Sequence, residues 1–107
     1  MMRKSPLRKN TDFGGNMKPD DLGKTVRMGI HKIYGIDLEY YLVRSVRRIS
    51  GRFSYSVVLD QSADGERETV YCADVTRSKR RADEIFSLIS DGEVTACTFF
   101  DVLEDMI

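Results

Sequence analysis

The feature that most constrains the fold is a change in apolar spacing close to Val75. Before this point, the stretch from Phe53 to Leu59 has an apolar side chain at every second residue, which is typical of a strand with one buried face. After it, apolar residues follow the i, i+3, i+4, i+7 spacing of one helix face, at Ala82, Ile85, Phe86 and Ile89. Strands followed by helices indicate an α+β domain.

Three other segments carry strand signals. Apolar and other residues alternate weakly from Thr25 to His31, and Glu68 to Val75 predicts another strand. The stretch from Leu38 to Ile49 is rich in Tyr, Val and Leu and predicts a longer strand. Both of its parities carry apolar groups, which leaves open which face is buried. Turn signals separate the strands at Tyr34 to Asp37, Ser50 to Arg52 and Asp64-Gly65.

Two short helices are expected at the C-terminal end of the sequence. Thr76 or Ser78 can cap the first, and Gly92 suits the left-handed position after its last turn. Thr95 can cap the second, whose apolar residues are Phe99, Val102, Leu103 and Met106. The sequence therefore predicts an antiparallel meander of three or four strands covered by a C-terminal helical hairpin, because a sheet with one apolar face needs a cover.

Domain organisation follows from length and from a change in composition. The chain has 107 residues, which fits one domain over residues 25–107 and excludes a two-domain enzyme. Residues 1–24 contain both prolines and few large apolar groups without a period. Such a segment buries too little surface to offset its ordering entropy, so we expect a flexible polar tail. Met17 and Met28 leave open a later translation start.

The net charge is zero but unevenly distributed. Residues 1–52 hold 12 basic and 5 acidic side chains, whereas residues 53–107 hold 5 basic and 12 acidic ones. The overall balance argues against a generic nucleic-acid-binding protein, which needs an excess of Lys and Arg.

The sequence shows no targeting signal and has few cysteines, and both observations predict a cytoplasmic location. No apolar run reaches the ~18–20 residues of a transmembrane helix, and no apolar stretch follows Arg3 and Lys4 as in a secretory signal. The two cysteines, Cys72 and Cys97, lack the spacing of a zinc or redox motif and are expected to be small buried hydrophobic residues. We expect a cytoplasmic protein without membrane contact.

Several segments resemble a family of small bacterial proteins of unknown function. They are Asp74-Val75-Thr76, Ile85-Phe86, Val94-Thr95, the C-terminal stretch from Phe100 to Ile107 with its aspartate-valine-x-glutamate-aspartate signature, and Tyr40 to Val43. The resemblance covers roughly Leu38 to Ile107. Family members often carry proline after the cap, where this chain has Ala96. The family implies one compact domain in a bacterial cell and assigns no activity, cofactor or catalytic residue.

No motif in the sequence predicts catalysis, a cofactor or a metal. Gly23-Lys24-Thr25 lacks the earlier glycine of a phosphate-binding loop. The loop that starts at Asp60 resembles half of a calcium-binding loop, but Tyr71 stands where the bidentate carboxylate is needed. His31 is the only histidine and has no nucleophile motif beside it, so we expect a surface residue. An enzyme would have to combine His31 with a cysteine and the C-terminal carboxylates.

The two helix ends carry charges that oppose the helix dipole. Basic residues crowd the first turn of the first helix, and acidic residues crowd the end of the second. In an antiparallel hairpin the two clusters lie side by side, so we expect them to neutralise each other; a cation site at the acidic cluster is the less favoured alternative. The clusters are Arg77, Lys79, Arg80 and Arg81, and Asp101, Glu104 and Asp105.

A second basic cluster marks the candidate interaction surface. Arginines beside aromatic residues are typical of surfaces that bind proteins or phosphate backbones, although they also protect exposed sheet edges. We predict a non-enzymatic interaction module that acts on a protein partner or by self-association through the sheet, with nucleic-acid binding through Arg44–Arg52 as the alternative. The candidate residues are Arg44, Arg47, Arg48, Arg52 and Tyr41.

Overall fold

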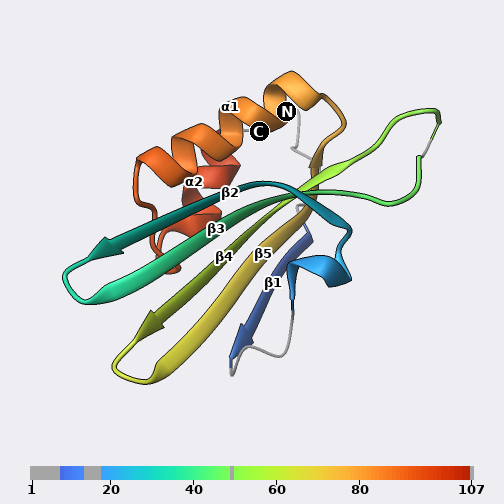
Figure 1. Ribbon diagram of the computed structural model, residues 1–107. Helices are drawn as coiled ribbons and strands as arrows, with labels where there is room; N and C mark the ends of the chain where they lie inside the picture. Colours follow the sequence, from blue (N-terminus) through green and yellow to red (C-terminus); the bar gives the residue numbers. More distant parts are fainter. Residues whose placement is uncertain (1–7, 14–17, 49, 107) are drawn as a thin grey trace, which may run out of the picture.

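A computed structural model describes residues 8–13, 18–48 and 50–106, with an antiparallel sheet and two helices on one of its faces (Figure 1). The strands are β1 (Arg8–Phe13), β2 (Lys24–Ile33), β3 (Ile36–Arg44), β4 (Tyr55–Ala63) and β5 (Glu66–Thr76). The helices are α1 (Lys79–Asp91) and α2 (Phe99–Met106), and a short 3-10 turn, η1 (Pro19–Asp21), precedes β2.

The strand order is β1-β5-β4-β3-β2, so β2 to β5 form a meander in which each strand pairs with the next. The predicted α+β class and the meander covered by a helical hairpin are confirmed. A fifth strand was not predicted: β1 runs antiparallel to β5, with Arg8 opposite Ala73 and Phe13 opposite Glu68. It pairs through backbone groups on the free side of β5, which requires no apolar alternation in its own sequence.

The structure differs from the predicted flexible tail over part of residues 1–24. β1 and η1 both lie within that segment, and β2 already begins at Lys24. The missing apolar pattern led to the tail prediction, but an edge strand needs only one neighbour for its backbone hydrogen bonds. Residues 1–7 and 14–17 lie outside the described residues, so the prediction stays untested there.

The predicted long strand from Leu38 to Ile49 ends earlier, at Arg44. The backbone leaves the sheet at Ser45, whose N–H donates to the Ser54 carbonyl at 2.8 Å and whose hydroxyl donates to the Arg47 carbonyl at 2.9 Å. These bonds close the base of a loop between β3 and β4. Apolar Val46 therefore lies in this loop, 76% exposed.

Two tight turns connect the hairpins where the sequence predicted them. Tyr34 and Gly35 have φ values of 47° and 79°, and Asp64 and Gly65 have 51° and 78°. Two consecutive residues with positive φ form the turn that matches the twist of paired strands. The segment from Asp60 that resembles half of a calcium-binding loop is therefore part of the β4–β5 hairpin.

Helix α1 begins as predicted and ends differently. The hydroxyl of Ser78 accepts a hydrogen bond from the Arg81 N–H at 3.2 Å, which identifies Ser78 and not Thr76 as the cap. Gly92 has a φ of −79°, so the predicted left-handed glycine is wrong. The left-handed residue is Glu93, with a φ of 50°, because the Gly92 N–H continues the helix by donating to the Leu88 carbonyl at 3.1 Å.

Helix α2 begins at Phe99, after a turn in which the Thr98 N–H donates to the Thr95 carbonyl at 3.2 Å. The predicted cap at Thr95 is therefore displaced to Thr98, whose carbonyl accepts from Val102 at 3.0 Å. Phe99 and Leu103 are buried as predicted.

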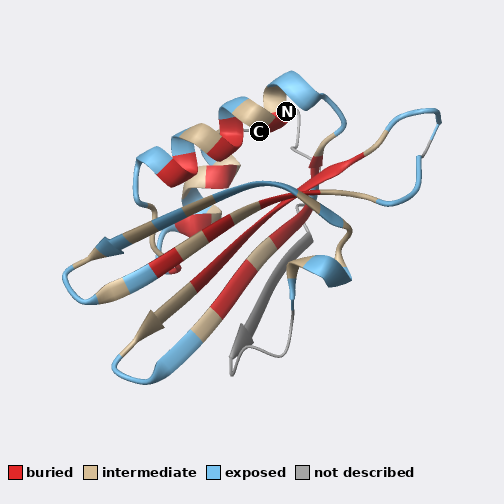
Figure 2. Ribbon diagram, viewed as in Figure 1, coloured by how far each residue is buried: buried red, intermediate tan, exposed pale blue. Residues whose placement is uncertain are grey.

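The main core lies between the two helices and the face of the sheet that they cover (Figure 2). On β3 this covered face carries Leu38, Tyr40 and Leu42, all buried, which settles the open question about that strand. The Tyr40 hydroxyl crosses the core and donates to the Val94 carbonyl at 2.6 Å. Burial, with a contribution from Glu93, raises the pKa of Tyr40 to about 12. Cys72 is buried in this core, whereas Cys97 is exposed, contrary to the prediction that both are buried.

Candidate interaction surface

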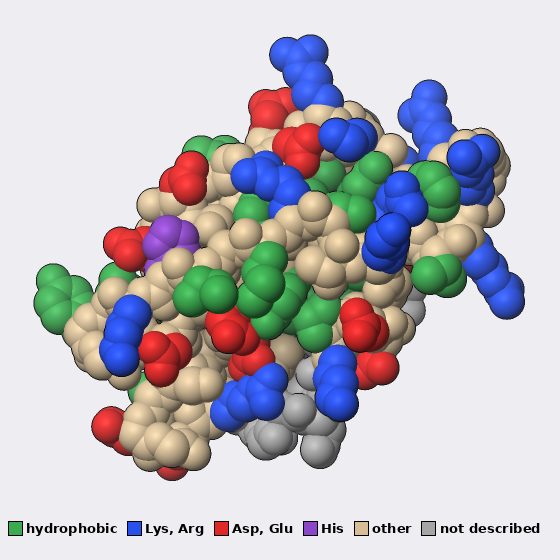
Figure 3. Space-filling model, viewed as in Figure 1, with side chains coloured by type: hydrophobic (Ala, Val, Ile, Leu, Met, Phe, Trp, Pro, Cys, Tyr) green, Lys and Arg blue, Asp and Glu red, His purple; other side chains and the backbone are tan. Residues whose placement is uncertain are grey.

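Strand β2 forms one edge of the sheet and contains no buried residue. Its exposed apolar side chains are Val26, Met28 and Ile30, at 41%, 51% and 67% exposure. Over the described part of the chain, no strand pairs with its outer side. Figure 3 shows hydrophobic side chains gathered in the middle of the visible surface with lysines, arginines and acidic groups around them. A ten-residue strand with open backbone groups and apolar side chains is a template for pairing.

A bulge between Thr25 and Arg27 interrupts the pairing of β2 with β3 and turns Arg27 toward α1. The Arg27 guanidinium lies over the Phe86 ring, 4.7 Å from its centroid, and donates to the Ser87 hydroxyl at 3.2 Å and the Asp83 carbonyl at 3.3 Å. These contacts hold the edge strand against the helix although Arg27 itself remains exposed.

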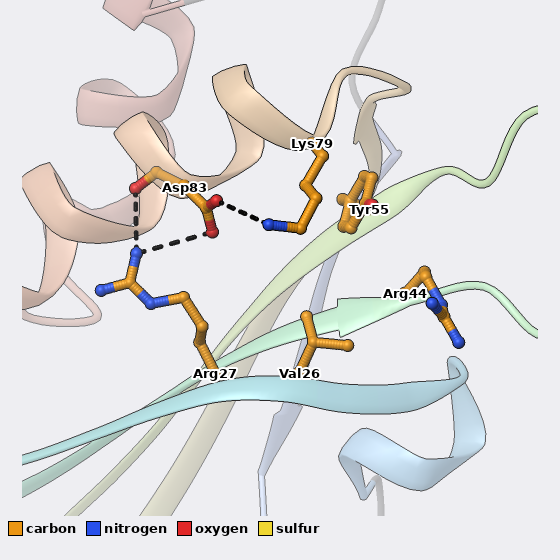
Figure 4. Close-up of a pocket in the computed structure, with 6 residues that line it drawn as sticks. All are labelled: Val26, Arg27, Arg44, Tyr55, Lys79 and Asp83. Carbon is orange, nitrogen blue, oxygen red and sulfur yellow. Dashed lines mark hydrogen bonds and ion pairs between the residues drawn. The ribbon is translucent and has the colours of Figure 1, made fainter.

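Beside the bulge, β2, the end of β3 and the first turns of α1 enclose a hollow of about 400 Å³ (Figure 4). Figure 4 shows Arg27 and Lys79 directed toward Asp83, whereas the guanidinium of Arg44 points away from that carboxylate. Lys79 Nζ lies 3.4 Å from Asp83 Oδ2, and Arg27 Nη1 lies 3.6 Å from Oδ1. Three cations and one carboxylate give the lining a net positive charge. The lining residues are Val26, Arg27, Arg44, Tyr55, Lys79 and Asp83.

The predicted arginine cluster is only partly brought together. Arg44 and Arg48 both stack on the Phe53 ring, at 4.3 Å and 4.9 Å from its centroid. The Nε atom of Arg44 is buried and has no hydrogen-bond partner in the described part of the chain. Arg47 and Arg52 are exposed in the same loop. Over residues 8–13, 18–48 and 50–106, no carboxylate forms an ion pair with Arg47, Arg48 or Arg52.

Tyr41, the fifth candidate, does not join this cluster. Successive strand residues point to opposite faces, so Tyr41 lies on the face opposite the helices while Arg44 lines the hollow on the helix side. Its hydroxyl donates to Glu39 Oε1 at 2.8 Å. Burial, followed by this hydrogen bond, raises the pKa of Tyr41 to about 12.

Tyr41 belongs instead to a polar group on the opposite face. Arg67 donates from Nε to Asp60 Oδ1 at 2.7 Å and from Nη2 to Oδ2, a bidentate contact that raises the pKa of Arg67. The Asp60 side chain is only 9% exposed. Removal of Arg67 would therefore leave a buried carboxylate without its cationic partner, which is destabilising. A hollow of about 390 Å³ lies between this pair and Ile30 of β2, with Asp37 and Glu39 in its lining.

His31 is not the plain surface residue that the sequence predicted. It is half-buried, with Nε2 3.1 Å from Ser90 Oγ and Nδ1 3.6 Å from Glu93 Oε2. A serine, a histidine and a carboxylate in this order resemble a catalytic triad. However, Ser90 is buried and its Oγ faces the backbone of Gly29, where a β-carbon would lie 2.4 Å away. The hydroxyl thus packs α1 against β2.

The two helix-end clusters do not neutralise each other as directly as expected. The described ion pairs of the basic cluster stay within α1: Lys79 with Asp83, and Arg80 and Arg81 with Glu84. The predicted proximity is nevertheless found, because Arg81 donates to the Met106 carbonyl at the end of α2. Arg81 thereby compensates the negative end of the second helix dipole.

The described residues include neither a cluster of metal ligands nor a membrane-spanning helix. No group of three or more His, Cys, Asp or Glu side chains in that part of the chain has a geometry that could hold a metal ion. Neither helix of the described chain is long and apolar enough to cross a membrane.

Residues 27–107 match a protein family that is described as a family of unknown function, DUF6514. The chain belongs to this family. The match begins at Arg27 in β2, directly after the bulge, so it extends beyond the segment that showed the resemblance and includes the meander from there on and both helices. No curated protein and no solved structure matches the chain significantly.

Sequence reasoning missed Arg27, Lys79 and Asp83 as members of one site. Arg27 and Asp83 are far apart in the chain and meet only because α1 folds back over the edge of the sheet. The one local signal was the basic first turn of α1, which violates the dipole preference; it pointed to Lys79 but not to its partners.

Proposed function

We propose that this domain is a protein-interaction module that binds another polypeptide along the edge formed by β2. The observation that carries the proposal is a ten-residue edge strand whose outer side is open over the described residues and whose Met28 and Ile30 are exposed. Addition of a strand to such an edge supplies backbone hydrogen bonds, and the exposed side chains supply selectivity. The exposed free thiol of Cys97 suits a reducing compartment such as the cytoplasm, where we place this interaction.

A binding role rather than a catalytic one is supported by the burial of Ser90. The side chains that most resemble a catalytic group, Ser90 and His31, are used to pack α1 against β2. Substrate would have to displace this contact before it could reach the hydroxyl.

The test compares charged substitutions on the edge with one on the helix. Met28→Lys and Ile30→Lys interrupt the apolar edge, and Leu88→Lys is the control because Leu88 is an equally exposed apolar side chain of α1, at 57%. Tagged chains are cross-linked in lysate of the source cells, and light scattering measures self-association. The proposal expects bound protein, or a dimer, that is lost in both edge variants and kept in the control. Equal capture and equal mass in all chains would refute it.

A second candidate function is nucleic-acid binding through the β3–β4 loop. The observation in its favour is that Arg47, Arg48 and Arg52 have no carboxylate partner among the described residues, while Arg48 stacks on Phe53. Phosphate contacts by free arginines give an affinity that falls steeply with salt. Absence of binding to single- or double-stranded DNA or RNA at low salt would exclude this function.

A further inference from the structure

The edge strand β2 has a charge of one sign. Its sequence contains Lys24, Arg27, His31 and Lys32 and no acidic residue. At the hairpin end, Lys32 lies 3.8 Å from Asp37 and His31 lies 3.6 Å from Glu93, so carboxylates of this chain compensate that end. The bulge end is different, because among the described residues Asp83 is the one carboxylate that lines the hollow shared by Arg27, Arg44 and Lys79.

The ion pairs of Asp83 with Lys79 and Arg27 are weak, so both cations can also contact a carboxylate of a ligand. Lys79 is 80% exposed and Arg27 is 42% exposed, and both reach Asp83 at distances longer than a hydrogen bond between charged groups. The guanidinium of Arg44 points away from Asp83, so that carboxylate does not form an ion pair with it. The hollow therefore offers a net positive charge immediately beside the open edge.

A second copy of this chain does not supply the missing negative charge through β2. If two β2 strands paired antiparallel about Met28, Lys24 of each would lie opposite Lys32 of the other. Like charges directly opposite each other in a sheet are destabilising. Self-pairing of β2 in this register is therefore disfavoured, whereas acidic residues on an added strand would complement its charge.

We infer that β2 binds an extended acidic segment of another protein, with a carboxylate side chain of that segment in the hollow lined by Arg27, Arg44 and Lys79. This inference rests on the proposed function and names the chemistry of the partner. The backbone of the segment pairs with β2, its apolar side chains lie beside Met28 and Ile30, and its acidic side chain takes a place next to the bulge. Charge complementarity of this kind fixes the register of the added strand.

The probe is a fluorescent peptide of the same length as β2 in which glutamate alternates with valine. A peptide with lysine in place of glutamate and a single-stranded oligonucleotide are the comparison ligands. Fluorescence anisotropy measures the affinities, and hydrogen–deuterium exchange locates the bound peptide. We expect the glutamate peptide to bind and to protect the amides of β2 from exchange. Failure of this peptide to bind, equal binding of the lysine peptide, or tighter binding of the oligonucleotide overturns the inference.

Two substitutions in the hollow predict effects of opposite sign. Lys79→Gln removes a cation and is expected to lower the affinity for the glutamate peptide about two- to fivefold. Asp83→Asn removes the competing carboxylate and is expected to raise this affinity by a similar factor. Arg80→Gln and Glu84→Gln are matched controls, because Arg80 and Glu84 are the adjacent, exposed residues of the same helix and do not line the hollow; Glu84 forms ion pairs with Arg80 at 3.8 Å and Arg81 at 3.7 Å. Equal effects of the hollow and control variants contradict the inference.

The two proposals fail in different ways. If capture of a cellular partner depends on Met28 and Ile30 but not on Lys79 or Asp83, the edge is the docking strand and the acidic assignment is wrong. If the chain dimerises through β2, the interaction module stands and the acidic partner is refuted.

Discussion

Strands β4 and β2 belong to the same meander but have opposite environments. Every residue of β4 from Tyr55 to Asp60 is buried, whereas β2 has no buried residue along its whole length (Figure 2). Both sequences contain alternating apolar residues. The difference comes from strand order, because β4 has a neighbour on each side and β2 ends the sheet. Apolar side chains of β4 therefore contribute to the core, whereas Val26, Met28 and Ile30 of β2 remain exposed.

The largest expected effect tests burial directly. Leu59→Ala in β4 removes a fully buried side chain from the core beneath the helices and is expected to lower the free energy of unfolding by about 2–5 kcal/mol. Ile30→Ala in β2 removes a side chain that is 67% exposed and is expected to cost less than about 0.5 kcal/mol. Urea denaturation followed by circular dichroism measures both. Similar losses for the two variants would contradict the assignment of Ile30 as a side chain outside the core.

Two carboxylates on the face opposite the helices, one buried and one exposed, provide a second comparison. Asp60→Asn in β4 disrupts the bidentate contact with Arg67 and is expected to cost about 1–3 kcal/mol, because Asp60 is almost fully buried. Asp37, which pairs with Lys32 of β2, is 59% exposed, so Asp37→Asn is expected to cost less than about 1 kcal/mol. Thermal unfolding of both variants at the same ionic strength is the measurement, and a larger loss for Asp37→Asn would contradict this ranking.

Gly29 is one of the half-buried residues of β2 and packs against α1, which gives a third comparison. A β-carbon at Gly29 would lie 2.4 Å from Ser90 Oγ, so Gly29→Ala forces this hydroxyl away from His31 and is expected to cost about 1 kcal/mol. In a chain that already carries Ser90→Ala, the same substitution is expected to cost much less. A double-mutant cycle of unfolding free energies measures the coupling. Additive effects on the free energy of unfolding would show that Gly29 and Ser90 are not energetically coupled.

The sequence predicted the elements whose local pattern is strong. Alternation identified β4, the spacing of Ala82, Ile85, Phe86 and Ile89 identified the buried face of α1, and Asp64-Gly65 identified a hairpin. It could not predict β1, because backbone pairing along the free side of β5 leaves no apolar pattern in the pairing segment. The predicted meander already implied that the strand from Thr25 lies at one edge of the sheet, whereas nothing in the sequence indicated that β1 pairs with the strand at the other end of the meander.

The candidate surface was predicted only in part, because several of its residues come together only in the folded chain. Arg44 and Tyr41 are close in sequence and were grouped together, but strand geometry places them on opposite faces of the sheet. Lys79 and Asp83 join Arg44 and Arg27 only through the packing of α1 over the bulge of β2. Contacts of this kind depend on the tertiary arrangement and have no signature in local spacing.

The pairing of neighbours in the meander also has a kinetic consequence. Strands β2 to β5 can form by successive closure of hairpins, each of which joins segments that are adjacent in the chain. Contacts that are local in sequence form fast, because little chain entropy is lost in closing each loop. The pairing of Arg8 with Ala73 requires closure over most of the chain, so β1 should be the last strand to join during refolding and the first to detach during unfolding.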